Sequence, residues 1–212
     1  QTEVEDRVHQ LAADKNVHGI LVQMPLPSHL DTEAVLRLIP AEKDVDGLTE
    51  ASMGRLMRDV PGHVGCTPLG VLRLLQHYGI ATSGKHVVVI GRSTLVGLPL
   101  SVLLARKGID ATVTLAHSRT THLEELCRSA DIVVSATGIA HSITAAHIAP
   151  GATCIDVGIS RTEAGIVGDF DAASVTGIAG ALTPMPGGTG IMTVACLMEN
   201  TINAAVMQGV QV

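Results

Sequence analysis

The stretch from His86 to Leu100, HVVVIGRSTLVGLPL, combines a glycine turn with hydroxyl side chains that could bind a phosphate. Apolar residues lead into Gly91, and a helix-like pattern resumes at Leu95. A helix that begins after a parallel strand presents free N–H groups and a partial positive charge, which suits an anionic group. Three interpretations compete for this turn: a dinucleotide site, a serine nucleophile on a strand-to-helix elbow, and a plain loop.

The spacing of the turn argues against the nucleophile. A nucleophile elbow reads G-x-S-x-G, whereas Leu95 stands where the second glycine is needed after Ser93. A dinucleotide fingerprint reads G-x-G-x-x-G, and here Ser93 takes the place of its second glycine. Ser93 could donate its hydroxyl to a phosphate, and Gly97 would let the helix pack closely on the strand. The pattern alone leaves the dinucleotide site and the plain loop open.

The end of the next apolar run, TVTLAHSRTTH, indicates which dinucleotide would bind. An NAD site carries an acidic residue at the end of the second strand for the ribose hydroxyls, and no carboxylate stands there. Ser118 and Arg119 instead place a hydroxyl beside a guanidinium, the groups that hold a ribose phosphate through charge-assisted hydrogen bonds. A solvated loop arginine is the alternative. Together the two turns favour NADP over NAD.

The elements that would position these groups alternate between strand and helix, which is typical of a doubly wound parallel sheet. The apolar runs predict strands at 86–91, 111–116, 131–136 and 152–157. Helices are predicted at 95–107 and 121–128, and a long apolar helix is predicted over 191–208.

The first part of the chain mixes short elements. An amphipathic helix opens it, and HGILVQM, residues 18–24, reads as a buried strand stopped by Pro25. Asp31 is expected to cap a short helix. Thr67 is expected to cap a helix that ends before Gly79. The fold class is α/β, with a Rossmann-like doubly wound domain at 66–187 and part of a second α/β catalytic domain at 1–65, completed by 188–212.

Composition limits the partners that we expect. Of the 212 residues, 46% are hydrophobic and 16% charged, so the chain folds around a sizeable core. An aromatic fraction of 1% and a net charge of −6 argue against nucleic acid. No apolar run reaches the roughly 18 residues that span a bilayer, and no membrane partner is expected. Four scattered cysteines indicate reduced thiols in the cytoplasm, and the histidines show no spacing for a metal site.

The chain resembles one known family over most of its length, from about His18 to Thr201. The segments that recur in order are GILVQMPLP, EKDVDG, CTPLG, VVVIGRSTLVGLPL, HSRT, IDVGISR, VGDFD and TPMPGGTGIMTVACLMENT. They are similar to the bifunctional methylenetetrahydrofolate dehydrogenase/cyclohydrolase family, the FolD proteins. The resemblance implies NADP-dependent oxidation of methylene-tetrahydrofolate to the methenyl cation and hydrolysis of that cation to formyl-tetrahydrofolate. It also implies a cleft between two domains, a folate substrate and a homodimer.

The resemblance implies roles for single residues as well. Gln23 would correspond to the glutamine that tunes the catalytic lysine, and Asp46 to the aspartate that holds the folate head group. The substrate contacts would be Val22, Gln23, Met24, Asp46, Pro184, Met185, Pro186, Gly187 and Gly188. Together with Arg119, inferred above from its guanidinium, the expected cofactor contacts are Thr67, Gly91, Arg92, Ser93, Ser118, Arg119 and Ile159.

The proposed role of Asp46 agrees with its chemistry. A pterin presents an amino group and a ring N–H side by side, and a carboxylate accepts from both, which offsets the cost of desolvating the charge. The alternative is that Asp46 is only a turn residue before Gly47.

The chain departs from the family pattern in three places. The motif Y-x-x-x-K, whose lysine acts in the cyclohydrolase step, is absent, and no lysine follows Tyr78 at that spacing. We expect a segment ahead of Gln1 to carry it. Gly65 and Ile191 stand where the family has proline, which should alter local stiffness without changing the chemistry. Two alternatives stay open: a non-catalytic NADP- or folate-binding homologue or fragment, and another small-molecule NADP-dependent dehydrogenase.

Overall fold

The computed structural model describes residues 1–163 and 165–211, which form two compact units. The first unit comprises Gln1–Cys66 and Val194–Val212, and the second comprises Thr67–Thr193. The second change of unit therefore falls within the last helix, α8 (Thr189–Met207), a few residues after the predicted seam at 187 and 188.

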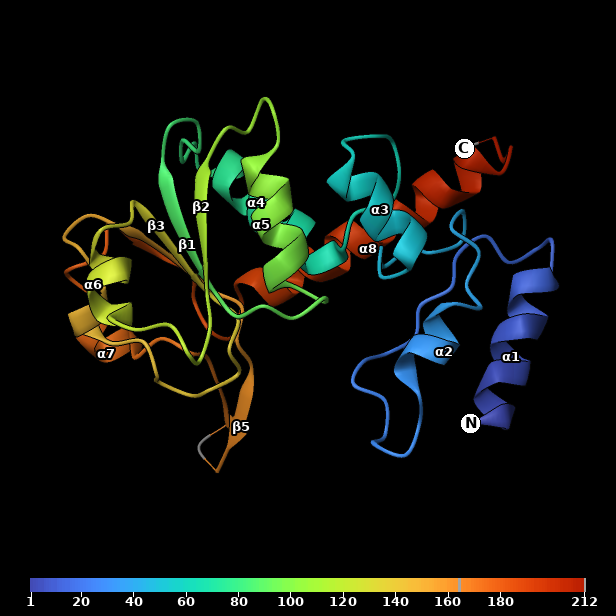
Figure 1. Ribbon diagram of the computed structural model, residues 1–212, viewed down its shortest axis with the longest axis horizontal. Helices are drawn as coiled ribbons and strands as arrows, with labels where there is room; N and C mark the ends of the chain where they lie inside the picture. The colour runs from blue at the N-terminus through green and yellow to red at the C-terminus, as the bar shows by residue number, and fades with distance from the viewer. Residues whose placement is uncertain (164, 212) are drawn as a thin grey trace. The chain divides into compact units, whose positions relative to one another are not determined.

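The second unit is built on a parallel sheet (Figure 1). Its strands, in the spatial order β2-β1-β3-β4-β7, are β1 (His86–Ile90), β2 (Thr112–Ala116), β3 (Ile132–Ser135), β4 (Thr153–Asp156) and β7 (Ala181–Leu182). The predicted α/β fold with a parallel sheet is confirmed. The first four strands match the predicted ranges to within one residue at each end. β1, β3 and β4 are buried along most of their length, whereas in β2 only Ala116 is buried.

Helices cover both faces of this sheet. Figure 1 shows α4 (Cys66–His77) and α5 (Gly97–Ala105) on one face and α6 (Leu123–Arg128) and α7 (Ala172–Val175) on the other. A two-stranded antiparallel hairpin, β5 (Ser160–Thr162) with β6 (Gly165–Val167), projects from the end of β4. The sequence prediction contained neither this hairpin nor β7.

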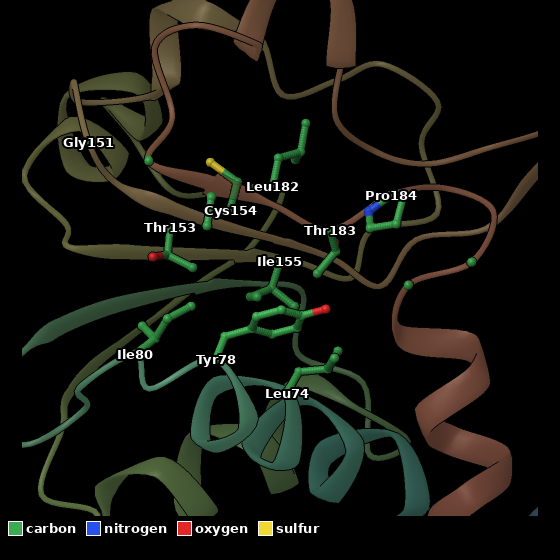
Figure 2. A pocket seen from close by; sticks show the side chains of 14 residues that line it. Leu74, Tyr78, Ile80, Gly151, Thr153, Cys154, Ile155, Leu182, Thr183 and Pro184 are labelled. Carbon is green, nitrogen blue, oxygen red and sulfur yellow. The ribbon is translucent and has the colours of Figure 1, made fainter.

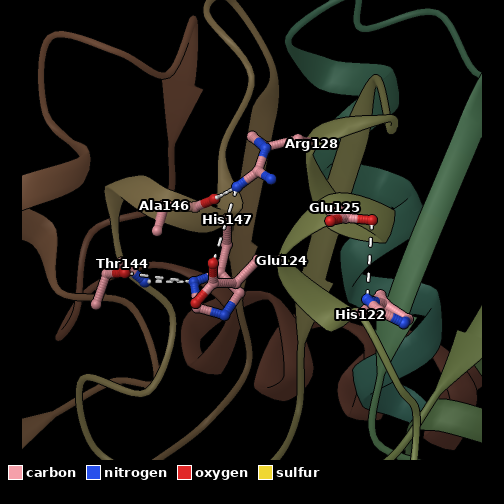
Figure 3. Close-up of polar contacts among 7 residues, drawn as sticks. All are labelled: His122, Glu124, Glu125, Arg128, Thr144, Ala146 and His147. Atoms are coloured by element: carbon pink, nitrogen blue, oxygen red, sulfur yellow. Dashed lines mark hydrogen bonds and ion pairs between the residues drawn. The ribbon is translucent and has the colours of Figure 1, made fainter.

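The short 3₁₀ helix η1 (Ala145–His147) is attached to α6 by polar contacts (Figure 3). Arg128 donates from Nη1 to the carbonyl oxygen of Ala146 and lies 3.9 Å from the carboxylate of Glu124. The backbone N–H of Thr144 donates to Nδ1 of His147 over 3.2 Å. These contacts fix the layer that covers Val88, Val133 and Cys154 in the core below.

The first unit packs its helices around a small apolar core. The buried residues are Val8, Ile20, Val35, Leu36 and Ile39, contributed by α1 (Thr2–Ala13), α2 (Thr32–Leu36) and the segments between and after them. The third helix of this unit is α3 (Glu50–Met57).

The predicted strand at 18–24 is wrong. Only Ile20 pairs there, in a single parallel bridge with Asp44, and its N–H donates to the carbonyl oxygen of Lys43 over 2.7 Å. The pairing stops because the partner segment turns at Gly47, where φ is +65°. A strand needs a neighbour of matching length, and a single run of apolar residues does not reveal whether one exists.

The polar loop before Gly47 is buried, and its lysine side chain is hydrogen bonded to the end of α1. Lys43 is 6% exposed, and its Nζ donates to the carbonyl oxygens of Leu11, Ala12 and Asp14 at the end of α1. An ammonium at this position satisfies carbonyl groups that a helix C-terminus leaves without partners. The loop is therefore held against α1.

Two expected helix caps have different outcomes. Asp31 caps α2, since its carboxylate accepts from the N–H of Ala34 over 3.0 Å. Thr67 is not a cap, because α4 begins one residue earlier at Cys66 and already includes Thr67. The end of α4 is followed by Gly79 with a φ of +65°, as the glycine there predicted.

Helix α8 begins two residues before and ends one residue before the long apolar helix predicted over 191–208. By length and composition alone its 19 residues, with a mean hydropathy of 1.2, suffice to cross a membrane. The core helix of a water-soluble protein has the same features.

Candidate functional site

The loops after β1 and β2 lie side by side at the carboxyl edge of the sheet. Ile90 is in register with Ala116, and the N–H of Gly91 donates to the carbonyl oxygen of Ala116 over 2.9 Å. Since β1 has β2 on one side and β3 on the other, the chain reverses its direction of winding beside β1. Ligands of open α/β sheets bind at this kind of switch point.

The turn after β1 is a cradle that only glycine can form. At Gly91 φ is +117°, and a Cβ atom there would lie 2.5 Å from the carbonyl oxygen of Ala136. A Cβ atom on Gly97 would lie 1.8 Å from the carbonyl oxygen of Gly91. The start of α5 therefore rests directly on the turn, as the sequence analysis expected of Gly97, and a ligand can approach the backbone closely.

Ser93 lies in the loop just ahead of α5, and its hydroxyl still has a proton to donate. Its Oγ accepts from the N–H of Val96 over 3.2 Å, and its carbonyl oxygen accepts from the N–H of Leu98. The side chains of Arg92 and Ser93 are both exposed. The loop thus presents a hydroxyl donor, a guanidinium and a helix N-terminus to the same solvent-facing region.

The HSRT segment is a tight turn whose backbone is held by hydrogen bonds to the side chains of His117 and Thr120. The N–H of His117 donates to Oγ1 of Thr120 over 2.9 Å, and the N–H of Thr120 donates back to the carbonyl oxygen of His117 over 2.8 Å. The N–H of Arg119 donates to Nδ1 of His117, so that this ring nitrogen acts as an acceptor. Ser118 and Arg119 occupy the exposed tip.

A series of threonines connects α4 to the carboxyl end of β4. Thr67 Oγ1 lies 3.1 Å from Thr193 Oγ1, which donates to the carbonyl oxygen of Thr189 over 3.1 Å. Thr189 in turn donates to the carbonyl oxygen of Asp156, the last residue of β4, over 2.7 Å. Ile159 follows shortly after in the chain and is 59% exposed. The structure therefore brings Thr67 toward the same sheet edge, by contacts that the sequence analysis did not contain.

Asp169, which the sequence analysis quoted only as part of a motif, organises the loop after β3. It is fully buried, and its Oδ2 accepts from the hydroxyl of Ser135 over 2.7 Å and from both the N–H and the hydroxyl of Thr137. A Cβ atom on Gly158 would lie 1.8 Å from its Oδ1, so glycine is required there. Asp169 follows the largely exposed hairpin of β5 and β6, so the local sequence carries no signal of this role.

Asp156 holds the loop after β4 in the same way. Its carboxylate accepts from the backbone N–H groups of Gly158, Asp169 and Phe170. Burial raises the pKa of Asp156, and the neighbouring charge of Asp169 adds to that rise, whereas the three N–H groups oppose it. The two aspartates fix the ends of β3 and β4, and of the predicted cofactor residues only Ile159 follows one of these two strands.

The predicted substrate turn from Pro184 to Gly188 borders an open pocket of about 660 Å³ within the second unit. Figure 2 shows Leu74 of α4 and Tyr78, just after that helix, facing Ile155 and Thr183 across it. Most of the lining is apolar. A second pocket of about 340 Å³ includes Pro184 and Met185 together with the buried carboxyl group of Asp156.

The predicted folate residues of the first unit follow one bridge. Gln23 comes after Ile20, Asp46 comes after Asp44, and the bridge between Ile20 and Asp44 is parallel, so both lie beyond the same end of it. Gln23 is exposed and donates to the carbonyl oxygen of Met24 over 3.1 Å. The side chains at 22 and 24 pack on the apolar core instead.

Asp46 is partly buried in a setting that disfavours its charge. Burial is the largest cause that raises the pKa of Asp46, and the charge of Asp44 raises it further. Hydrogen bonds from the thiol and the backbone N–H of Cys66 lower it in part. The charged form of such a carboxylate is stabilised when a ligand supplies further hydrogen-bond donors. Within residues 1–163 and 165–211, no three His, Cys, Asp or Glu side chains gather in a way that could hold a metal ion.

Comparison with known families gives two matches that cover most of the chain. The family described as tetrahydrofolate dehydrogenase/cyclohydrolase, NAD(P)-binding domain, matches residues 65–209. The catalytic domain of the same name matches residues 1–46.

Curated relatives and solved structures agree with these matches. The bifunctional protein FolD of Zymomonas mobilis is 49% identical over 97% of this chain and 72% of its own length. The FolD protein of Sphingopyxis alaskensis is 52% identical over 97% of this chain and 70% of its own length. A methylenetetrahydrofolate dehydrogenase of the silkworm, Bombyx mori, superposes with a TM-score of 0.94 at 44% identity, over 98% of this chain and 74% of that one. The FolD protein of Trypanosoma brucei, solved with NADP and an inhibitor, superposes with a TM-score of 0.90 at 38% identity. The match covers 97% of this chain and 72% of that one.

Proposed function

The chain belongs to the tetrahydrofolate dehydrogenase/cyclohydrolase family, and on this premise we propose which of its residues carry out the reactions of that family. The protein is an NADP-dependent methylenetetrahydrofolate dehydrogenase and methenyltetrahydrofolate cyclohydrolase. It oxidises methylene-tetrahydrofolate to the methenyl form and hydrolyses the methenyl form to formyl-tetrahydrofolate. The residue roles below rest on the geometry of each unit.

The glycine cradle at the end of β1 carries the proposal for the cofactor. Because Gly91 and Gly97 bring bare backbone to the start of α5, the pyrophosphate of NADP can lie against the helix N-terminus. Arg92 and Ser93 would bind its phosphate oxygens. Bound NADP supplies the hydride acceptor, and the protein supplies its position.

The turn after β2 would distinguish NADP from NAD. Ser118 and Arg119 stand at its exposed tip, and its internal hydrogen bonds hold the backbone beneath them. A hydroxyl and a guanidinium on a turn whose backbone is already fixed can bind the ribose phosphate with little further loss of backbone entropy. Ile159, shortly after the last residue of β4, and Thr67, in the first turn of α4, would flank the nicotinamide half of the cofactor.

The first unit would hold the pterin through Asp46. Its carboxylate can accept from the amino group and the ring N–H of a pterin at once, and these donors would stabilise the charge that burial disfavours. Gln23 would act at the same end of the bridge, with Val22 and Met24 contributing backbone. The turn formed by Pro184, Met185, Pro186, Gly187 and Gly188 would supply the remaining substrate contacts.

The chemistry asks mainly for placement. Hydride transfer requires the methylene carbon and the nicotinamide in contact and shielded from water, and most of the rate acceleration comes from holding them so. The residues of the two loops after β1 and β2 bind and orient the cofactor, while Asp46 orients the pterin by two hydrogen bonds. A cation forms on the folate in this step, and the negative charge of Asp46 favours it.

We further propose that the protein works in the cytoplasm as a homodimer. The four cysteines are free and buried, which suits a reducing compartment. The dimer rests on the family resemblance alone. Sedimentation at several protein concentrations tests it, and a mass that stays at one chain throughout would contradict it.

The decisive experiment follows NADPH formation with methylene-tetrahydrofolate in the full-length protein. We expect absorbance from NADPH with NADP and much less with NAD, and calorimetry should show that NADP and a folate analogue both bind. A folded protein that binds NADP but oxidises a different reduced substrate, and ignores folate, would overturn the proposal.

A further inference from the structure

Asn200 is a buried amide with both of its N–H donors used. It lies on α8 within the first unit and is 4% exposed. Its Nδ2 donates to the carbonyl oxygen of Val45 over 2.8 Å and to that of Val64 over 3.0 Å. The same nitrogen lies 3.6 Å from the sulfur of Cys66. One side chain therefore joins two separate backbone segments.

The two segments that Asn200 joins are packed in direct backbone contact. Val45 precedes Asp46, and Val64 precedes Gly65 and Cys66. A Cβ atom on Gly47 would lie 2.5 Å from the backbone nitrogen of Gly65, so no side chain separates the turn from the second segment. The position of Asp46 is consequently set by how these two segments are held together.

Cys66 completes the arrangement from the second segment. Its sulfur lies 3.3 Å from the carbonyl oxygen of Val45, and its thiol and backbone N–H both hydrogen bond with the carboxylate of Asp46. Burial raises the pKa of the Cys66 thiol, which keeps it protonated and able to donate. The thiol thus contacts both the carbonyl group before Asp46 and the Asp46 side chain.

We infer that Asn200 is a positioning residue for folate binding, which acts by clamping Val45 and Val64 so that the Asp46 carboxylate points at the pterin. This inference rests on the proposed function of Asp46. Without the amide, two buried carbonyl groups lose a donor, and the turn that carries Asp46 is freed to move. The cofactor residues all belong to the other unit, so NADP binding does not depend on this clamp.

The test compares Asn200→Ala with Asn203→Ala in the full-length protein. Asn203 lies on the same helix but is exposed, so its loss controls for the removal of an asparagine amide from α8. Calorimetry measures the dissociation constants of a folate analogue and of NADP, and thermal unfolding confirms that each variant is folded. We expect N200A to weaken folate binding on the order of tenfold with NADP affinity unchanged, and N203A to leave both unchanged.

Two further variants separate the possible outcomes. Asp46→Ala should abolish folate binding, and if it does not, the proposed function of Asp46 has failed and the inference with it. If D46A loses folate while folded N200A binds it within twofold of the original protein, only the inference is overturned. Should N200A not fold, Asn200→Ser retains one donor and must show the same folate-specific loss, at a smaller size, for the inference to stand.

Discussion

A Cβ atom placed on Gly97 would lie 1.8 Å from the carbonyl oxygen of Gly91, although five residues separate the two in the chain. The atom it would meet belongs to the backbone, which cannot turn aside as a side chain can. The first turn of α5 and the loop after β1 therefore share a single fixed arrangement, which is the arrangement that a pyrophosphate requires.

Gly97→Ala should accordingly damage both the fold and the cofactor site. We expect a loss of about 1–3 kcal/mol in the free energy of unfolding, from overpacking, together with weakened NADP binding. Urea unfolding and calorimetry measure the two effects. Gly54→Ala is the matched control, because α3 leaves open space around Gly54 and alanine is the better helix former there. Equal stability of the G97A protein would contradict the close contact.

Arg119→Ala should change cofactor preference and leave stability unaltered. Loss of a charge-assisted hydrogen bond to the ribose phosphate is expected to weaken NADP binding by roughly tenfold to a hundredfold while NAD binding stays the same. Parallel titrations with NADP and NAD measure this ratio. Arg58→Ala, an exposed arginine of the other unit, controls for the loss of one positive charge. An equal loss of affinity for NADP and NAD would contradict a specific contact with the ribose phosphate and would show that Arg119 only attracts negative charge in general.

Asp46→Asn should abolish folate binding without lowering stability at neutral pH. The pKa of Asp46 is raised in the folded protein, so its contribution to stability is present below the ordinary pKa of 3.8 and is lost as pH rises through the raised value. The asparagine variant carries no such loss. Urea unfolding from acid to neutral pH should therefore show a smaller decline for D46N than for the original protein, and a steeper decline would refute this sign.

Lys43→Met should destabilise the first unit. The methionine matches the length of the lysine chain but leaves three carbonyl oxygens at the end of α1 without their donor, at a cost of about 3 kcal/mol. Lys15→Met removes an exposed lysine and should change the free energy of unfolding very little. Denaturant unfolding, read with a probe in the first unit, makes the comparison. Similar losses in both variants would argue against a capping role for Lys43.

Most of the sheet of the second unit could be predicted from the sequence, because β1, β3 and β4 are buried runs with turn residues at their ends and β2 follows the same alternation of strand and helix. β7 is only two residues long, and β5 and β6 only three, so none of them carries a periodic signal. The segment Lys43–Val45 reads as a polar loop, yet all three residues are buried. Lys43 donates to carbonyl groups about thirty residues away, which local sequence cannot show, whereas Asp44 accepts from the nearby N–H groups of Leu48 and Thr49.

The candidate site divides in the same way. Local motifs suffice to predict Gly91, Ser93 and Ser118 as cofactor residues, because a turn, a hydroxyl and a helix start are neighbours in the chain. Thr193 and Asn200 escape detection, since each acquires its role from a partner far away in sequence. The separation is 155 residues for Asn200 and Val45. Both residues lie within a motif shared with the family, but the motif does not reveal which residues they contact.

The long separation of Asn200 from Val45 also affects the order in which the two units fold during synthesis. Residues 67–193 are continuous, so the NADP-binding unit can make its contacts while synthesis is still under way. The folate unit draws on both sides of this segment and must close a long loop before Asn200 reaches Val45. A chain that ends at residue 193 and has been released from the ribosome should thus already bind the nucleotide and still fail to bind the pterin.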